Sequence, residues 1–167
     1  MRELIRSGKL PLRDTVKAED AEAIRRLTAA TEFFRPDEVE IAAELASERL
    51  ARGLESGYHF LFAEGRKGLL GYSCFGPIPC STVSWDLYWI AVDPEVQGLG
   101  LGHYLLQATE AKVRAEGGRA LYAETSGRSL YRPTRWFYRR EAYEEAAVLA
   151  DFYAEDDPKV IFVKKLV

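Results

Sequence analysis

The chain has 167 residues, a formal net charge of −3 at pH 7 and 47% hydrophobic residues. This length is typical of one domain with its own core. The acidic balance argues against a general nucleic-acid-binding surface, which would be basic. No apolar run is long enough to span a bilayer, and the first residues lack the apolar region of a signal peptide. We therefore expect a cytoplasmic protein with no nucleic-acid and no membrane partner.

The two cysteines, Cys74 and Cys80, lie outside any CxxC motif and have no histidine cluster beside them. This pattern argues against a zinc site. We expect no metal and two reduced, buried thiols.

Hydrophobic periodicity predicts, in chain order, a strand, two helices, three strands, a helix, a strand, a helix and two strands. The expected boundaries for the first part are a strand at 10–16, a helix at 19–30, a helix from Pro36 to Gly57, a hairpin over 58–77 and a strand at 85–92. For the rest they are a long helix from the glycine segment to Gly117, a strand at 120–126, a helix at 132–143, and strands at 144–153 and 160–167 around a polar turn at 154–159. In the long helix, Leu101, Tyr104, Leu105 and Ala108 line one side, and His103, Gln107, Glu110 and Arg114 line the other.

The segment PEVQGLGLGHYLL, residues 94–106, places three glycines directly before the long helix. Glycines at a helix start let a ligand approach the backbone N–H groups, and the helix dipole then favours an anion, usually phosphate. The segment lacks the Lys-Ser or Lys-Thr of the P-loop, and His103 stands where the dinucleotide motif has its third glycine. The residues therefore predict a phosphate site of another type, with a tight strand-to-helix turn as the alternative.

The longer segment LYWIAVDPEVQGLGLGHYLL resembles the signature of the GNAT acetyltransferase superfamily, whose core Q/R-x-x-G-x-G/A is met by Gln97, Gly100 and Gly102. The resemblance implies an α/β (α+β) fold, with one acyl-CoA N-acyltransferase domain over 1–167. Its mixed sheet would have about seven strands, splayed between the fourth and fifth, with about four flanking helices.

The resemblance also implies acetyl-CoA as co-substrate, with its pyrophosphate on the glycine segment and its pantetheine arm along the fourth strand. The implied contacts are Ile90, Ala91, Val92, Gln97, Gly98, Leu99, Gly100, Leu101, Gly102, His103 and Tyr131. Two positions depart from the family pattern: Tyr131 replaces a common asparagine, and Ala142 replaces a common glycine.

Acetyl transfer to an amine needs a base for the amine proton and benefits from an acid for the departing thiolate. The resemblance assigns the acid to Tyr138 in RWFYRREAY, which could instead be a tyrosine packed over the core. Asp86 lies on the same strand face as Val92 and is a candidate base. Glu124 on the neighbouring strand competes with it, and either carboxylate could instead bind a cationic acceptor or be solvated.

Two further groups of residues leave alternatives open. The arginines are either a solvated basic face or, in part, ligands of the CoA phosphates: Arg128, Arg132, Arg135, Arg139 and Arg140. The aromatic residues of 31–36, with Trp85, Tyr88 and Trp89, either wall an acceptor pocket or belong to the core, which suits Trp89 best.

The leading hypothesis is an acetyl-CoA-dependent N-acetyltransferase that moves the acetyl group to a primary amine of a small molecule or peptide, by direct transfer in a ternary complex. The alternative within the same fold is a non-catalytic acyl-CoA-binding sensor or interaction module. A third hypothesis is a different nucleotide-phosphate enzyme. The sequence leaves open the acceptor, the use of another short acyl group, and a homodimer.

Overall fold

The computed structural model describes residues 2–66 and 68–166. Seven strands form a mixed sheet in the order β1-β2-β3-β4-β5-β7-β6, which confirms the predicted α/β class and strand number. The chain divides into two compact units. The first runs to Gly76 and resumes over Trp89–Ala111, and the second holds Pro77–Tyr88 and the chain from Lys112 onward. Among the described residues, no helix is both long and apolar enough to cross a membrane.

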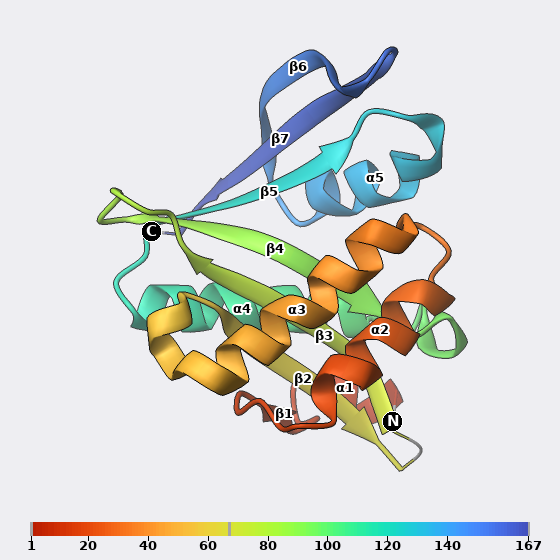
Figure 1. Ribbon diagram of the computed structural model, residues 1–167, viewed down its shortest axis with the longest axis vertical. Coiled ribbons are helices and arrows are strands. Elements are labelled where there is room, and N and C mark those ends of the chain that lie inside the picture. Colours follow the sequence, from red (N-terminus) through yellow and green to blue (C-terminus); the bar gives the residue numbers. More distant parts are fainter. Residues whose placement is uncertain (1, 67, 167) are drawn as a thin grey trace. The chain divides into compact units, whose positions relative to one another are not determined.

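The first unit packs helices on both faces of its antiparallel strands (Figure 1). Its elements are α1 (Arg2–Arg6), β1 (Leu12–Arg13), α2 (Asp20–Ala30), α3 (Pro36–Arg52), η1 (Gly53–Ser56), β2 (His59–Gly65), β3 (Gly68–Pro77, to Gly76), the end of β4 (Ser84–Val92), η2 (Pro94–Val96) and most of α4 (Leu101–Ala115). Neighbouring residues of a strand point to opposite faces. Accordingly, the Tyr72 hydroxyl lies 2.8 Å from Thr28 on α2, whereas the Ser73 hydroxyl lies 2.8 Å from Thr109 on α4.

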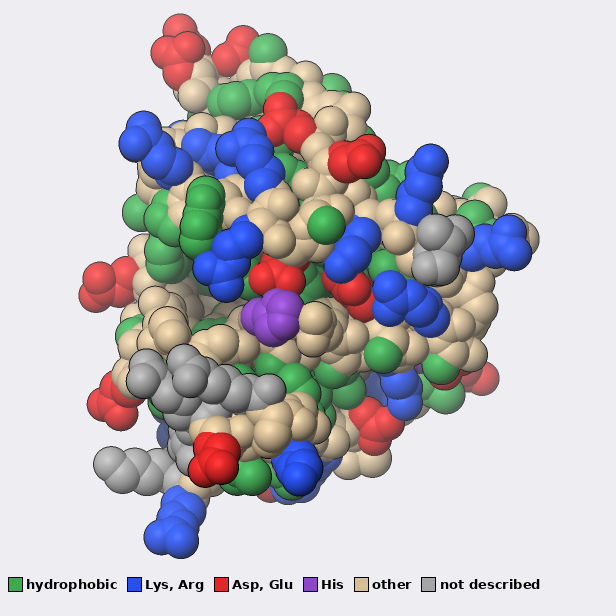
Figure 2. All heavy atoms as spheres, turned by 180° about the vertical axis from the view of Figure 1, so that it is seen from behind, with side chains coloured by type: hydrophobic (Ala, Val, Ile, Leu, Met, Phe, Trp, Pro, Cys, Tyr) green, Lys and Arg blue, Asp and Glu red, His purple; other side chains and the backbone are tan. Residues whose placement is uncertain are grey.

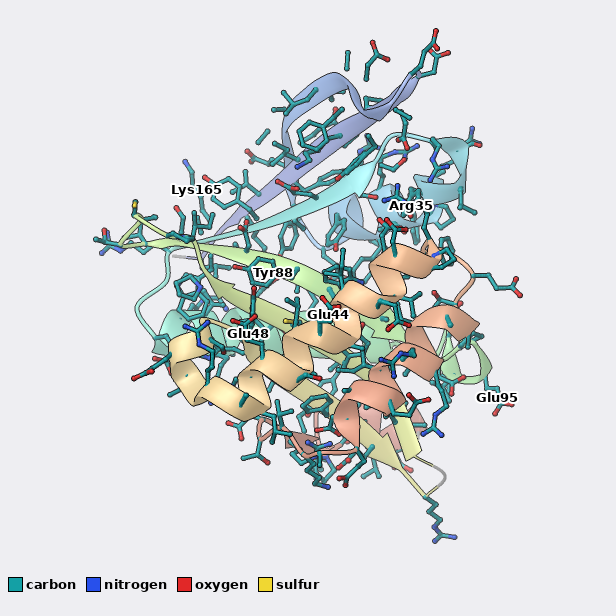
Figure 3. The ribbon with its side chains drawn as sticks, viewed as in Figure 1. Arg35, Glu44, Glu48, Tyr88, Glu95 and Lys165 are labelled. Carbon is teal, nitrogen blue, oxygen red and sulfur yellow. The ribbon has the colours of Figure 1, made fainter. Side chains whose placement is uncertain are left out.

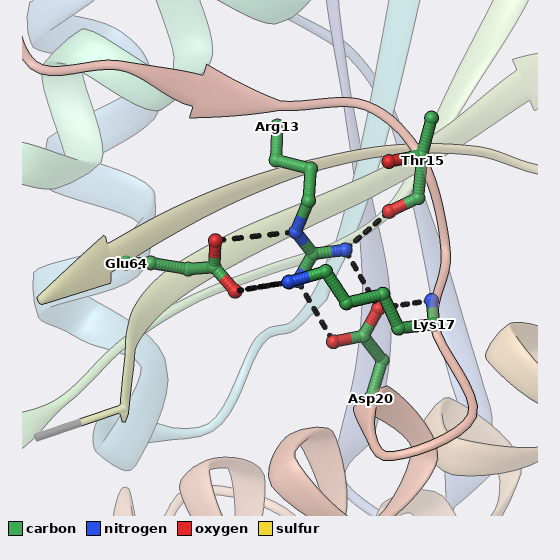
Figure 4. A network of polar contacts seen from close by, with 5 residues as sticks. All are labelled: Arg13, Thr15, Lys17, Asp20 and Glu64. Atoms are coloured by element: carbon green, nitrogen blue, oxygen red, sulfur yellow. Dashed lines mark hydrogen bonds and ion pairs between the residues drawn. The ribbon is translucent and has the colours of Figure 1, made fainter.

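An ion-pair network ties the short strand β1 to α2 and β2 (Figure 4). The Arg13 guanidinium donates two hydrogen bonds of 2.8 Å to Asp20 and bonds of 2.7 and 3.2 Å to Glu64. It also lies 4.3 Å from the ring centroid of Phe62. Asp20 accepts a further bond of 2.7 Å from the Lys17 backbone N–H. Because Asp20 is buried, Arg13 is the counter-charge that makes its burial tolerable.

The second unit is built on the start of β4 and three further strands. Its other elements are the end of α4, β5 (Ala120–Ser126), η3 (Ser129–Tyr131), α5 (Arg132–Arg140), β6 (Glu144–Ala154) and β7 (Asp157–Lys165). β4 pairs with β5 in parallel over Ser84–Leu87 and Ala120–Ala123 only. The predicted splay between these strands is thus seen as an early end of their ladder, since both strands continue beyond it. On its other side β5 pairs with β7, which pairs with β6 at the sheet edge.

Several predicted boundaries were wrong, and backbone conformation explains most of the differences. The long helix begins at Leu101 and not within the glycines, because Gly98 and Gly100 have φ values of 74° and 93°. The second helix ends at Arg52 and continues as η1 to a left-handed Gly57. Similarly, α5 ends at Arg140, just before the positive φ of 64° at Ala142.

Other differences lie at the ends of the chain and in the core. Helix α1 was not expected, and β1 has two residues instead of the predicted 10–16. The last strand begins at Asp157, so the predicted turn at 154–159 is much shorter, and the expected end at 167 falls outside the described residues. Cys74 is buried as expected, but Cys80 is exposed. Glu110, expected on the polar side of the long helix, is buried.

Candidate functional site

The segment that follows β4 is held in place by its own polar groups. The Asp93 N–H donates to the Leu70 carbonyl at 2.9 Å, and the Asp93 side chain accepts from the Glu95 N–H at 2.8 Å. The Gln97 side-chain amide donates to the Val92 carbonyl at 3.2 Å. Glu95 itself points away from the fold (Figure 3). These bonds fix where the glycine segment starts.

The glycine segment presents open backbone at the start of α4. At Gly98, an added Cβ would meet no described atom within 4 Å, and at Gly100 it would meet only Ile5, at 3.8 Å. The first turn of a helix has no internal carbonyl for its N–H groups, and the Tyr104 N–H donates to the Gly100 carbonyl at 3.0 Å. The N–H groups of this first turn point toward the N-terminal end of α4, beside the open glycines. Together with the helix dipole, they suit an anion such as a phosphate.

Gly71 on β3 is what brings α4 close to the strands. A Cβ on Gly71 would lie 2.9 Å from the Ala91 carbonyl and 3.1 and 3.3 Å from the side chains of Leu105 and Leu101. Ala91 is buried, whereas Ile90 and Val92 are half-buried. The residues predicted to contact the donor along β4 and at the start of α4 thus form one continuous segment of the first unit.

The aromatic residues proposed as pocket walls or core separate into two groups. Trp85 is buried in the second unit, 2.6 Å from where a Cβ on Gly118 would lie, so it belongs to the core. Trp89 is half-buried in the first unit, 6.3 Å from Phe34 between ring centroids. Its indole N–H is buried and has no hydrogen-bond partner among the described residues.

An acidic cluster lies on one face of the strands in the second unit. Asp86 on β4 is paired with Tyr122 on β5, so their side chains share a face, and Glu124 follows on that face two residues later. Burial raises the pKa of the half-buried Asp86 carboxyl, and the Glu124 carboxylate raises it further, whereas Lys159 lowers it. A carboxylate with a raised pKa is suited to accept a proton near neutral pH.

Lys159 on β7 completes this cluster, and sequence reasoning missed it. Its ammonium lies 2.6 Å from the Glu124 carboxylate. It also lies 3.7 Å from the ring centroid of Phe152 and 5.7 Å from that of Tyr153, both on β6. The sequence pattern assigned Lys159 to a turn, and only the pairing of β5 with β7 places it beside Glu124.

Tyr138 is buried on the other face of the same strands. Its ring packs at centroid distances of 5.4, 5.5 and 5.4 Å against Phe137, Tyr143 and Phe162. Burial raises the pKa of the Tyr138 phenol, so the hydroxyl stays protonated at neutral pH. Within the described part of the chain, no hydrogen bond to this hydroxyl is found.

Comparison with models of known protein families shows which family the chain belongs to. The family model described as "Acetyltransferase (GNAT) family" matches residues 22–141. The chain belongs to the GNAT family of acetyltransferases. A comparison with curated proteins gave no match.

Solved structures agree with this assignment. A crystal structure of a GNAT-family protein from Desulfovibrio desulfuricans is similar to this chain. The two sequences are 44% identical, the TM-score is 0.92, and the match covers 94% of this chain and 99% of that one.

Two more distant structures share the fold. The ribosomal-protein-S18-alanine N-acetyltransferase from Escherichia coli has 17% identity, a TM-score of 0.72 and coverage of 93% of both chains. A protein from Salmonella typhimurium, solved with acetyl-CoA, has 19% identity, a TM-score of 0.73 and coverage of 94% of both chains.

Three of the arginines around α5 of this GNAT chain serve its own structure. Arg128 pairs with the buried Asp157 at 3.0 Å, and Arg135 donates to the carbonyls of Ser126 and Arg128 at 2.7 and 2.9 Å. Arg139 pairs with Glu145 at 2.8 Å. Arg132 and Arg140 are exposed, and Lys and Arg side chains gather over α5 (Figure 2).

Tyr131, the remaining predicted cofactor contact, is buried at the end of η3, with the Arg128 guanidinium 5.8 Å from its ring centroid. Of the predicted site residues of this GNAT chain, those from Ile90 to His103 thus form one segment of the first unit. The second unit brings Asp86 and Glu124 to one face of its strands and Tyr138 to the other.

Proposed function

We propose that this chain is an acetyl-CoA-dependent N-acetyltransferase that moves an acetyl group to a primary amine of a small molecule or peptide. The domain is proposed to act as one acyl-CoA N-acyltransferase unit over residues 1–167. The observation that carries the proposal is the open glycine segment before α4, in a chain that belongs to the GNAT family.

The donor site proposed for acetyl-CoA is the segment from Ile90 to His103. A pyrophosphate would accept hydrogen bonds from the N–H groups that precede Tyr104, where Gly98 and Gly100 leave room for close approach. The amide groups of a pantetheine arm would bond to the end of β4, which continues beyond its ladder with β5. The fold neighbour solved with acetyl-CoA supports this choice of donor.

In the proposed reaction, Asp86, the half-buried carboxylate with the raised pKa, takes a proton from the bound ammonium. The neutral amine then attacks the thioester carbonyl carbon to form the C–N bond, and the C–S bond breaks as the carbonyl re-forms. The leaving thiolate takes a proton from Tyr138, whose buried hydroxyl is protonated at neutral pH, and the second proton lost by the nitrogen restores that hydroxyl through solvent. Direct transfer in a ternary complex requires both substrates to be bound before this step.

The acceptor is proposed to be cationic before it loses its proton, because two carboxylates, Asp86 and Glu124, share one face. The fold neighbour that acetylates an alanine of a ribosomal protein is one example of an amine acceptor on this fold.

The test is release of free CoA from acetyl-CoA in the presence of a panel of amines: polyamines, amino acids, aminoglycosides and peptides with free N-termini. Mass spectrometry of the amine checks that the acetyl group has been transferred. The proposal expects at least one amine to be acetylated by the wild-type chain and much more slowly by Asp86→Asn. Acetyl-CoA binding with no turnover on any amine would favour the non-catalytic sensor.

A further inference from the structure

The two side chains of the Glu124–Lys159 ion pair differ in their exposure to solvent. The Lys159 side chain is only 13% exposed, although it ends in a charge, whereas its partner Glu124 is 44% exposed. Phe152 and Tyr153 cover the Lys159 ammonium. A long, flexible lysine side chain is thus held by one carboxylate and two rings, which restricts both members of the pair.

The covering rings come from an irregular part of β6. The pairing of β6 with β7 shifts between Leu149 and Ala154, and Asp151 within this stretch has a φ of 50°. The Asp151 carboxylate accepts the Asp156 N–H at 2.9 Å, which fixes the shape of the irregular stretch. Such a bulge re-aims side chains, and here Phe152 lies over Lys159.

Glu124 and Lys159 both act on the ionisation of Asp86, through their charges. In the second unit, the ionisable groups on the Asp86 face are Tyr88 from β4, Tyr122 and Glu124 from β5, Asp157, Lys159 and Lys165 from β7, and Glu144 from β6. Of these, Asp157 is paired with Arg128. Glu124 opposes the ionisation of Asp86 and Lys159 favours it. Two carboxylates close together resist ionising at the same time, unless a cation offsets one of them.

We propose that Lys159 is a positioning residue for acetyl transfer: it fixes the Glu124 carboxylate and offsets its charge, so that Asp86 is the carboxylate left to take the proton. The inference rests on the proposed function for its catalytic meaning. Its structural part, the control of Asp86 by Lys159, holds whether or not the chain acetylates an amine. Lys159 touches no reacting atom in this account and acts through the two carboxylates.

The test is a titration of the Asp86 carboxyl carbon by NMR, on the full chain without any ligand. Four variants are compared with the wild type: Lys159→Met, Lys159→Arg, Glu124→Gln and the double variant Glu124→Gln/Lys159→Met. Lys165→Met is the matched control, because Lys165 is an exposed lysine at the end of the same strand (Figure 3).

Removing Lys159 should raise the pKa of Asp86, and removing Glu124 should lower it. The Lys159→Arg variant should stay close to the wild type, because arginine keeps the charge beside Glu124. In the double variant, the pKa of Asp86 should equal that of the wild type or lie just below it, because the raising effect of Glu124 and the lowering effect of Lys159 are lost together. Phe152→Ala leaves every charge in place but exposes the Lys159 ammonium to solvent. It should raise the pKa of Asp86, as Lys159→Met does, but by less.

The proposal is overturned if Lys159→Met moves the Asp86 titration no more than Lys165→Met does. If Lys159→Met does not fold, an unchanged titration in Phe152→Ala overturns it instead. Once an acceptor amine is known, the acid limb of the kcat/KM profile should shift with the Asp86 pKa in each variant. A shift in titration with no CoA release by the wild type would reject the proposed function and leave the role of Lys159 at Asp86 standing.

Discussion

Asp86 and Tyr138 lie on opposite faces of the strands in the second unit. Asp86 shares its face with its partner Tyr122, whereas Tyr138 packs on Phe162, which is paired with Ala123 on the other face. The strands therefore separate the proposed base from the proposed acid, and neither can pass a proton directly to the other. The two roles can therefore be tested separately.

The Tyr138→Phe variant should lower kcat by roughly a hundredfold and leave acetyl-CoA affinity nearly unchanged. Phenylalanine keeps the ring contacts with Phe137, Tyr143 and Phe162 and removes only the hydroxyl. Steady-state kinetics and a binding titration check both parts. Tyr143→Phe, another buried tyrosine of the same cluster, is the control and should keep its kcat. Equal activity in wild type and Tyr138→Phe would remove Tyr138 from the mechanism.

The Asp86→Asn variant should lose activity and gain stability. Burial and Glu124 raise the pKa of folded Asp86 above its unfolded value, so the folded state holds that proton more tightly. The free energy of unfolding of the wild type therefore falls as pH rises from the unfolded to the folded pKa value of Asp86, and it stays lower at higher pH. Asparagine does not ionise and causes no such loss, so the variant should have the higher Tm at neutral pH.

The stability difference should disappear at about pH 3, where the wild-type carboxyl is protonated in both states. Thermal unfolding across pH gives the comparison, with Glu155→Gln in the exposed β6–β7 turn as a control that should show no such trend. A lower Tm for Asp86→Asn at neutral pH would contradict the proposed environment of Asp86.

Gly100→Glu should weaken acetyl-CoA binding by about tenfold or more, because it blocks backbone approach and adds a negative charge beside the pyrophosphate. Gly117→Glu is a matched control, since Gly117 is also exposed and has a φ of 84° against 93° at Gly100. Both variants carry the same backbone strain and charge, but only one lies in the proposed donor site. Equal affinities by equilibrium dialysis would place the ligand elsewhere.

Arg13→Met should destabilise the fold by about 3 kcal/mol or more, because it leaves the buried Asp20 carboxylate without its counter-charge. Arg52→Met, which removes an exposed pair with Glu48, should change the free energy of unfolding by less than about 1 kcal/mol. Urea unfolding measures both. Similar losses in the two variants would mean that the network in the first unit is no stronger than a surface pair.

The sequence predicted the fold class and the donor segment because both depend on local patterns. Apolar alternation located β2 to β5, and the glycines with Gln97 located the turn before α4. Local patterns failed where an element is short or held by distant partners. A helix of five residues shows too little periodicity to detect, and β1 is held by the contacts of Arg13 with distant residues.

The acceptor side could be predicted only in part. Asp86 and Glu124 were identified as candidates from their strands, but which face each occupies depends on the register of β4, β5 and β7. Lys159 had no local signal, because its partner Glu124 lies on another strand and its covering rings depend on the irregular stretch of β6. Likewise, nothing in the sequence revealed that Tyr138 faces away from the carboxylates.

The most direct test of the central claim is isothermal titration of acetyl-CoA into the wild-type chain. Binding at one site per chain is predicted, with affinity lost in Gly100→Glu and kept in Gly117→Glu. No binding of acetyl-CoA by the folded wild-type chain would contradict the account.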